Sequence, residues 1–292
     1  ELAVKMVRKY WYEKGQENRV EIITFEGSFH GRSSAGIAAA GGEKLTKGFG
    51  PMLPGFVHLP WSNHAMIEAA INENTAAILI EPIQGEGGIR CLPDECLKGL
   101  RSLCDKNEIL LVVDEVQCGI GRTGKLFAHE WSGIEPDIAM IAKGIGGGFP
   151  LGAVLAKINA ASGMSAGTHG STYGGNPLAC SVGSKVLEIV STTDFLNSVT
   201  AKSGIISQGI LGLIDLYPDV FQEIRGTGLM LGIKCKCPNV DFVQKGYENA
   251  ILTVPASDNV IRLLPALNIT YEEINQALTR LEQTAKSLQK TL

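Results

Sequence analysis

The sequence has no uninterrupted apolar run of about 18 residues, so it offers no candidate for a membrane-spanning helix. Its charge is modest: 26 basic against 30 acidic residues give a net charge of -4, which argues against nucleic acid or an anionic membrane as a partner. Repeats and low-complexity tracts are also absent. What remains is a 292-residue chain, 45% hydrophobic, with room for one large domain and a smaller one.

The cysteines show no spacing typical of a disulfide framework or a metal site. The odd total of seven shows no zinc-finger spacing, and Cys235 and Cys237, two positions apart, are only weak evidence for a metal site. We therefore expect no metal, and we interpret the cysteines as buried, reduced thiols of a cytoplasmic protein.

The chain also lacks an initiator methionine and a helix cap at its start. Apolar residues at helical spacing from Leu2 to Trp11 predict that it opens inside an amphipathic helix, with no Ser, Thr, Asp or Asn in front. We expect that a natural N-terminal portion precedes Glu1, and that portion could include a targeting peptide.

Strand-like and helix-like segments alternate through the rest of the chain. Aliphatic runs predict strands at 20–25, 76–80, 109–114, 138–142 and 153–156, and apolar spacing predicts helices at 65–72, 96–106 and 179–190. This alternation indicates an α/β fold with a mostly parallel sheet and helices on both faces, over residues 1–190. Strands at 228–234 and 260–264 and a closing helix at 271–291 predict a small α+β domain over 191–292.

An aspartate and a lysine carry the main chemical signal. Asp114 ends an apolar run typical of a strand buried on both faces of a parallel sheet, and ligand crevices lie at the carboxyl ends of such strands. Lys143 follows 29 positions later in an apolar neighbourhood, which favours the neutral amine. Pyridoxal phosphate needs a lysine amine for its Schiff base and an anion at its pyridine nitrogen. With Gln117 available for the phenolic oxygen, the pair predicts a pyridoxal phosphate site. For either residue alone, a helix cap or a surface charge is the favoured interpretation.

The glycine-rich stretch between Asp114 and Lys143 resembles two nucleotide-binding motifs in its sequence, but its surroundings do not fit either motif. Residues 119–124 read G-I-G-R-T-G, as in the dinucleotide fingerprint, but Asp114 and Glu115 separate them from the strand and would repel a pyrophosphate. Leu126 stands where a P-loop needs Ser or Thr. An irregular loop is the preferred interpretation, and a nicotinamide-dependent oxidoreductase is a distant alternative.

Several motifs in fixed order resemble the class III aminotransferases over essentially the whole chain: residues 28–32 (SFHGR), 81–88 (EPIQGEGG), 114–117 (DEVQ), the Lys143 segment and 169–177 (HGSTYGGNP). Within that class the chain is most similar to members that act on N2-acetyl-L-ornithine. The resemblance implies a pyridoxal phosphate enzyme of fold type I and a homodimer with shared active sites at the subunit interface.

The resemblance also implies roles for cofactor-binding residues. Lys143 would hold the cofactor and act as general base and acid, and Asp114 would hold the pyridinium proton. The remaining contacts are Phe29 and Val116 on the ring faces, Gln117 on the ring hydroxyl, and Thr172 on the phosphate of the neighbouring subunit's cofactor.

Substrate contacts follow in the same way. Arg32 would clamp a substrate carboxylate, Ser171 would add a contact, and Arg262 would receive the α-carboxylate of glutamate or 2-oxoglutarate. Glu86 would pair with Arg262 when the donor is a terminal amine. Either arginine can instead form a structural ion pair, and His30 and His169 are interpreted as structural hydrogen-bonding residues.

The implied reaction moves the terminal amino group of N2-acetyl-L-ornithine to 2-oxoglutarate, giving the semialdehyde and L-glutamate, as in arginine biosynthesis. Alternatives are ornithine, succinyldiaminopimelate or 4-aminobutyrate as donor, an aminomutase, or an inactive fragment. One departure from the family is that the turn gripping the cofactor phosphate is missing before Glu1, so we expect weaker cofactor binding by this chain.

Overall fold

The computed structural model describes residues 1–61 and 63–289, which divide into two compact units. Unit 1 comprises residues 1–82, 92–120 and 128–189, and unit 2 comprises 83–91, 121–127 and the chain from 190 onward. The short segments of unit 2 lie inside the sequence of unit 1, and no compositional change marks them. The expected domain limits, 1–190 and 191–292, stay a prediction.

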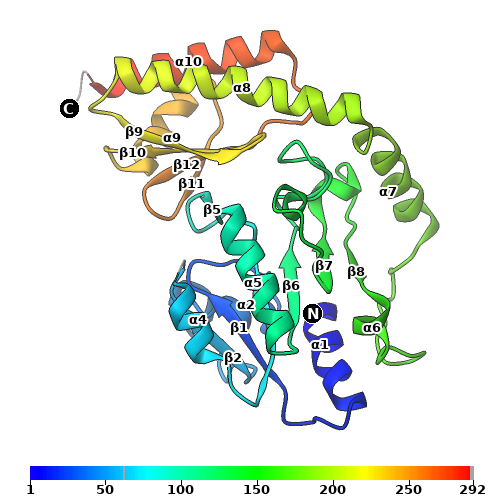
Figure 1. The fold of residues 1–292 in the computed structure, drawn as a ribbon. Coiled ribbons are helices and arrows are strands. Elements are labelled where there is room, and N and C mark those ends of the chain that lie inside the picture. Colours follow the sequence, from blue (N-terminus) through cyan, green and yellow to red (C-terminus); the bar gives the residue numbers. More distant parts are fainter. Residues whose placement is uncertain (62, 290–292) are drawn as a thin grey trace. The chain divides into compact units, whose positions relative to one another are not determined.

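Unit 1 is built on a six-stranded sheet with the order β2-β1-β3-β6-β7-β8 (Figure 1). Every neighbouring pair is parallel except β7–β8, which is antiparallel. The mostly parallel α/β sheet predicted from the sequence is therefore confirmed. Its strands are β1 (Glu21–Phe25), β2 (Phe56–Leu59), β3 (Thr75–Ile80), β6 (Leu110–Asp114), β7 (Ile138–Ile141) and β8 (Ala153–Ala156).

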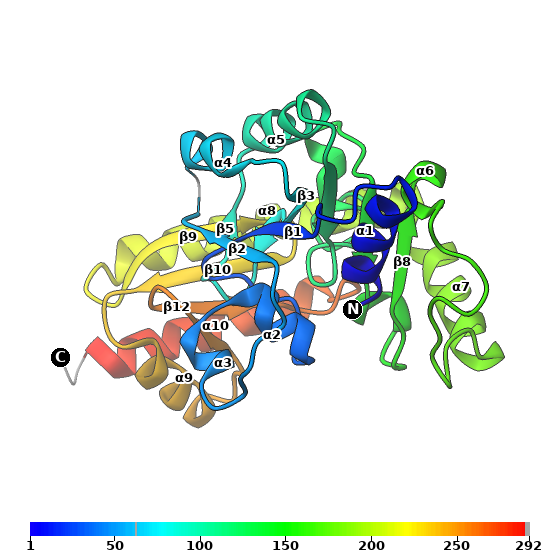
Figure 2. The same cartoon turned by 90° about the horizontal axis from the view of Figure 1, so that it is seen from below.

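Alternate residues of the central strands face two layers of helices. Ile78 and Leu111 belong to a core cluster with α4 and α5, whereas Ala77 and Val112 belong to a second cluster with α1, α2 and α6. Figure 2 shows α4 and α5 on one side of the sheet and α1 and α2 on the other. The helices of unit 1 are α1 (Leu2–Glu13), α2 (Ser34–Ala40), α3 (Glu43–Thr46), α4 (His64–Ala70), α5 (Asp94–Lys106), α6 (Ile158–Ala161) and α7 (Pro177–Val190).

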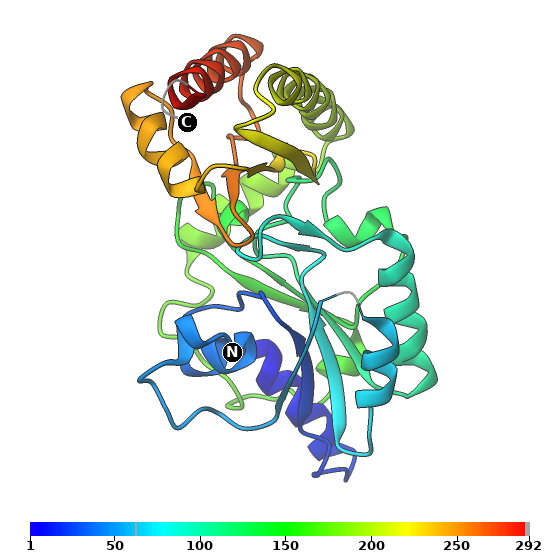
Figure 3. The ribbon, with the colours of Figure 1, turned by 90° about the vertical axis from the view of Figure 1, so that its left-hand side faces the viewer.

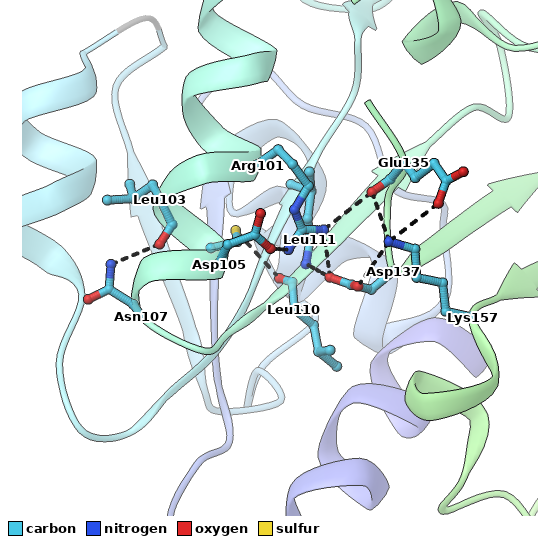
Figure 4. A network of polar contacts seen from close by, with 10 residues as sticks. Arg101, Leu103, Asp105, Asn107, Leu110, Leu111, Glu135, Asp137 and Lys157 are labelled. Atoms are coloured by element: carbon cyan, nitrogen blue, oxygen red, sulfur yellow. Dashed lines mark hydrogen bonds and ion pairs between the residues drawn. The ribbon is translucent and has the colours of Figure 1, made fainter. Parts of the chain in front are cut away.

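A polar network fixes the start of β6 against α5 and β7 (Figure 4). The carboxylate of Asp137 accepts hydrogen bonds from the Leu111 N–H and from Arg101 Nη1, both at 2.8 Å. Arg101 Nη2 also lies 2.7 Å from Asp105 Oδ1. The side chains of Arg101 and Asp137 are only 14% and 16% exposed, so water replaces these contacts poorly. The network sets the position of the strand that ends at Asp114.

Replacing Asp137 with alanine is expected to lower the free energy of unfolding by about 2–3 kcal/mol, because the Leu111 N–H and the Arg101 guanidinium lose a buried acceptor. Urea titration followed by circular dichroism measures the change. Glu43→Ala is the control: Glu43 and its ion-pair partner Lys47 are 84% and 82% exposed, and such a change stays within about 0.5 kcal/mol. Equal losses in the two variants would contradict this account.

Unit 2 contains an antiparallel sheet with the order β11-β12-β10-β9 and the small hairpin β4–β5. Side chains of α8, α9 and α10, among them Ile210, Phe242 and Leu281, share one core cluster with Phe221 and Ile233 of the sheet. Figure 3 shows these helices (olive, orange and red) beside the strands. The elements are β4 (Ile83–Gln84), β5 (Arg90–Cys91), α8 (Thr193–Leu216), β9 (Phe221–Thr227), β10 (Met230–Cys235), α9 (Asn239–Glu248), β11 (Val254–Ala256), β12 (Val260–Leu263) and α10 (Tyr271–Gln289).

The small α+β part was predicted, but its longest helix was not. The 24-residue helix α8 contains Gly204, Gly209 and Gly212, which weaken the helical signal of its sequence. A Cβ on Gly209 would come within 2.5 Å of the Leu278 side chain, so glycine there lets α8 approach α10 closely. The last two positions of the predicted helix 271–291 lie outside the described residues. Among the residues described, no helix combines the length and apolar content needed to cross a membrane.

Candidate active site

A cavity of about 430 Å³ in unit 1 is lined by both Asp114 and Lys143. Asp114 is the last residue of β6 and is paired with Met140 of the neighbouring parallel strand β7, and Lys143 follows the end of β7. Parallel pairing therefore brings two distant positions of the sequence to the carboxyl ends of adjacent strands. The cavity falls in the range of small-molecule sites, roughly 300–1,000 Å³.

The carboxylate of Asp114 is held at both oxygens. Oδ1 accepts a hydrogen bond from the Val116 N–H at 3.0 Å, and Oδ2 lies 2.9 Å from His30 Nδ1. The side chains of Asp114 and His30 are 7% and 3% exposed. Burial lowers the pKa of His30, but the hydrogen bond and charge of Asp114, together with the charge of Glu81, outweigh it and raise the pKa above its ordinary value. His30 and Asp114 thus form a buried, charge-assisted contact.

The residue before His30 is held by a second buried carboxylate. Phe29 lines the cavity, and its N–H donates to Glu81 Oε1 at 2.9 Å. Glu81 directly follows β3, as Asp114 ends β6. Gly31 has φ +115°, a conformation that other residues avoid, and it turns the chain into the segment leading to α2. The carboxyl ends of two adjacent strands thereby hold two consecutive residues, Phe29 and His30.

Lys143 has an unusual backbone conformation. It opens the short 3-10 turn Lys143–Gly146 with φ +47°, and its side chain is exposed toward the cavity. A non-glycine residue in this region costs about 1–3 kcal/mol and persists where the surroundings impose it, most often at functional sites. The conformation marks Lys143 as a residue whose placement the fold enforces.

The loop after Asp114 is anchored by the fully buried Glu115. Its carboxylate accepts hydrogen bonds from the N–H groups of Ala128 and His129, both at 2.8 Å, and contacts His129 Nδ1 at 2.9 Å. The residues between, including the G-I-G-R-T-G stretch, form turns and bends without a helix. The predicted irregular loop is confirmed, and the dinucleotide reading loses the helix N-terminus that it requires.

Some of the predicted site residues lie outside this cavity. Arg32 is exposed, and its guanidinium carbon lies 5.4 Å from the centre of the Phe29 ring. Ser171 and Thr172 are exposed in the loop before α7 and are not among the residues that line the cavity. In unit 2, Arg262 Nη1 lies 2.7 Å from Glu86 Oε1, as a charge contact outside hydrogen-bond geometry. The structure thus brings this predicted pair together.

Comparison with known proteins decides the family. Residues 1–285 match the model of the family described as aminotransferase class-III. The chain belongs to the class-III aminotransferases. It is 62% identical over 289 residues to an acetylornithine aminotransferase of Rhodobacter capsulatus, covering 99% of this chain and 74% of the relative. It is 55% identical over 288 residues to an acetylornithine aminotransferase of Mesorhizobium japonicum, covering 99% and 72%.

Solved structures agree with the class-III aminotransferase assignment. The ornithine aminotransferase of Toxoplasma gondii ME49 matches with a TM-score of 0.94 and 31% identity, over 99% of this chain and 70% of that one. The N-acetylornithine aminotransferase of Stenotrophomonas maltophilia K279a matches with a TM-score of 0.85 and 34% identity, over 100% and 72%. The fold is therefore that of pyridoxal phosphate-dependent aminotransferases, fold type I.

The residues at the cavity fit the cofactor of a class-III aminotransferase, pyridoxal phosphate. An amine and a carboxylate, from Lys143 and Asp114, line one cavity with Phe29 and Val116, so ring-binding and ring-polarising groups are together. The Gln117 amide oxygen is buried without a hydrogen-bond partner among the described residues. Gln117 directly follows Val116 but is not among the residues that line the cavity.

Sequence reasoning missed three side chains of this aminotransferase site. His30 and His169 were interpreted only as structural hydrogen-bonding residues; His30 contacts Asp114, and His169 lines the cavity. Glu81 was part of a recognised motif but had no assigned role. The signal for Glu81 was present in the sequence, since an acidic residue stands at or directly after the end of each of two apolar runs.

Proposed function

We propose that this class-III aminotransferase transfers the terminal amino group of N2-acetyl-L-ornithine to 2-oxoglutarate, giving the semialdehyde and L-glutamate in arginine biosynthesis. The observation that carries the proposal is the 62% identity, over 99% of the chain, to an acetylornithine aminotransferase. Relatives at 55% and 53% identity bear the same name. The reaction conserves the amino group, because one aldehyde and one amino acid form for each amine and oxo acid consumed.

Pyridoxal phosphate, when bound, supplies an aldehyde and an electron-accepting ring. Lys143 would offer the amine that holds the aldehyde. Its free amine would take a proton from the donor's amine-bearing carbon and give that proton to the carbon derived from the cofactor's aldehyde. Asp114 would hold the ring nitrogen with its carboxylate and stabilise the proton there. Phe29 and Val116 would restrain the ring, and the Gln117 amide nitrogen would donate to the oxygen of the ring hydroxyl.

Substrate binding is assigned to the arginines. The exposed guanidinium of Arg32, close to the ring of Phe29, suits the carboxylate of the acylated donor, with Ser171 as an additional contact. Arg262 suits the α-carboxylate of 2-oxoglutarate: it is 6% exposed, and its Nε has no hydrogen-bond partner among the described residues. Glu86, 44% exposed, neutralises Arg262 when a terminal amine is bound and can leave when a carboxylate arrives.

We also propose a homodimer in which Thr172 contacts the partner's cofactor phosphate. Unit 1 exposes several large apolar side chains that a second copy of the chain could cover, namely Leu155, Ile158, Tyr173, Leu178 and Ile189. Thr172 precedes Tyr173 and is not among the residues that line its own cavity, which is compatible with a shared site. The first turn of α1 lines the cavity, and N–H groups at a helix start suit the other side of a phosphate. A cytoplasmic location stays a prediction.

Initial rates with matched donors test the proposed reaction. With 2-oxoglutarate as acceptor and pyridoxal phosphate saturating, kcat/KM for N2-acetylornithine is expected to exceed that for ornithine, succinyldiaminopimelate and 4-aminobutyrate by at least about 10-fold each. Ornithine is the main competitor, because a solved ornithine aminotransferase has the TM-score of 0.94. A higher kcat/KM for ornithine would overturn the proposed donor and leave the family assignment intact.

A further inference from the structure

Glu86 lies in a short hairpin of unit 2. Strands β4 and β5 pair antiparallel, and Glu86 is part of the turn that joins them. Its carboxylate oxygen Oε1 lies 2.7 Å from Arg262 Nη1. Because the proposed choice between a terminal amine and a carboxylate depends on this contact, the residues that fix the hairpin also fix the position of Glu86.

The hairpin lies on one row of residues across the antiparallel sheet of unit 2. Gly232 of β10 is opposite Arg225 of β9 and also opposite Arg262 of β12. Directly opposite residues point to the same face of a sheet, so the two arginine side chains stand on either side of the glycine. A Cβ on Gly232 would come within 2.8 Å of Ile89 Cγ1. Ile89 of the hairpin therefore occupies the space above Gly232.

Arg225 holds the turn on the side away from Arg262. Its Nη1 donates a hydrogen bond to the Gly88 carbonyl oxygen at 3.2 Å and lies 2.7 Å from Asp258 Oδ2. The Ser257 N–H donates to the carbonyl oxygen of Glu86 itself, at 3.1 Å. A Cβ on Gly88 would come within 2.6 Å of the Ser257 carbonyl oxygen, so the turn lies directly against the segment 257–258.

The backbone conformation of the hairpin depends on this packing. Ile89 is fully buried and has φ +50°, which is rare for a β-branched residue. Such a conformation persists where the surroundings impose it. The contact between Ile89 and Gly232 therefore determines how the chain passes from Glu86 into β5.

The charge of Arg262 alone holds Glu86 weakly. The Glu86 side chain is 44% exposed, and its contact with Arg262 lies outside hydrogen-bond geometry. Ion pairs with an exposed partner and without a directed hydrogen bond contribute little. The contacts of the hairpin with Arg225, Ser257 and Gly232 are thus the stronger constraint on where Glu86 lies.

We propose that Arg225 and Ile89 are positioning residues that hold the hairpin so that Glu86 stays next to Arg262, and that they thereby set how readily Arg262 accepts a carboxylate. Neither residue touches a substrate in this role. The inference rests on the proposed roles of Glu86 and Arg262 in substrate selection and deepens them.

Binding of glutarate to the enzyme saturated with pyridoxal phosphate tests the proposal. Glutarate is a dicarboxylate without an oxo group, so it can bind at Arg262 but cannot accept an amine. Because Arg262 is available only when Glu86 is away, the dissociation constant rises as the available fraction of Arg262 falls. Glu86→Ala and Arg225→Ala are each expected to lower the dissociation constant of glutarate, measured by isothermal titration calorimetry, by about 3- to 10-fold.

Lys234→Ala is the matched control. Lys234 Nζ also binds Asp258, at 3.0 Å, and the side chains of Lys234 and Arg225 are 23% and 22% exposed. Arg225, however, also donates to the hairpin at Gly88. The dissociation constant of glutarate in Lys234→Ala should therefore stay within about twofold of the parent enzyme.

Tighter binding separates a positioning role from structural damage, because a disordered site binds its ligands more weakly. If Arg225 acts through Glu86, the double variant Glu86→Ala/Arg225→Ala should bind glutarate within about twofold of Glu86→Ala alone. If Arg225→Ala does not fold, Ile89→Ala replaces it with the same expectations, because it removes the side chain above Gly232 and leaves Arg225 in place.

The possible failures can be told apart. Unchanged or weaker binding in Arg225→Ala, with tighter binding in Glu86→Ala, would overturn this inference and leave the roles of Glu86 and Arg262 intact. Unchanged binding in Glu86→Ala would overturn those roles and the inference with them. Neither result bears on the identity of the amino donor, which the initial rates of the parent enzyme decide.

Discussion

Lys143→Ala is expected to lower transamination by more than about 10⁴-fold, because it removes both the amine that holds the cofactor and the group that moves the proton. The side chain is exposed and fills no part of the hydrophobic core, so the free energy of unfolding should change by less than about 0.5 kcal/mol. Alanine keeps the same demand on the backbone, since Lys143 has φ +47°. Turnover under saturating cofactor and a thermal melt measure both effects.

Borohydride reduction makes the Lys143 experiment specific. In the parent enzyme it should fix the cofactor's mass on the peptide that contains Lys143, and in the variant no such peptide should appear. Lys44→Ala is the matched control, because Lys44 is an exposed lysine of α3 outside the cavity. Added methylamine should restore part of the activity of Lys143→Ala, because it supplies a free amine, and it should not change the activity of Lys44→Ala. Persistent turnover in the variant would remove Lys143 from the chemistry.

Asp114→Asn is expected to lower kcat by about 10³-fold, because it removes the charge that stabilises the ring-nitrogen proton. The Val116 N–H and His30 Nδ1 contact different carboxylate oxygens of Asp114, at 3.0 and 2.9 Å. The single asparagine oxygen can still accept from the Val116 N–H, and its amide nitrogen then donates to His30 Nδ1 in the neutral imidazole. The fold should therefore persist, and the loss should fall on kcat more than on KM.

Steady-state kinetics with saturating pyridoxal phosphate and an absorbance spectrum of the bound cofactor test the Asp114 prediction. Asp219→Asn, at an exposed aspartate of unit 2, is the control variant, and its kcat and cofactor spectrum should equal those of the parent enzyme. A variant that binds cofactor with an unchanged spectrum and turns over at the parent rate would show that Asp114 does not contact the ring nitrogen.

The sequence predicted those parts of the fold that depend on local patterns. Apolar runs located β3 and β6 because both are buried along their length, and the acidic residue at the end of β6 marked the site. Strand β2 escaped notice because its burial is partial and its pattern mixed, and α9 because its apolar stripe is short. Partly buried elements leave weak patterns in a sequence.

The geometry of the site could be predicted only in part. Chain order and spacing brought Asp114 and Lys143 together through the rule for parallel strands. The contact between His30 and Asp114 joins residues 84 positions apart, and it depends on the left-handed turn at Gly31, which one sequence does not reveal. Nor does a sequence show that a buried nitrogen or amide is left without a partner.

Residues 121–127 belong to unit 2 although they lie between two segments of unit 1, and this affects how the chain can be divided into fragments. The chain leaves unit 1 after Ile120 and re-enters it at Ala128, and one residue, Glu115, binds both flanks: its carbonyl accepts from the Gly119 N–H and its carboxylate from the Ala128 N–H. Cutting the polypeptide at residue 190 would therefore separate residues 83–91 and 121–127 from the rest of unit 2, to which they belong. We expect that neither half folds on its own. Gene fragments or chimeras divided at residue 190 would have the same incomplete units.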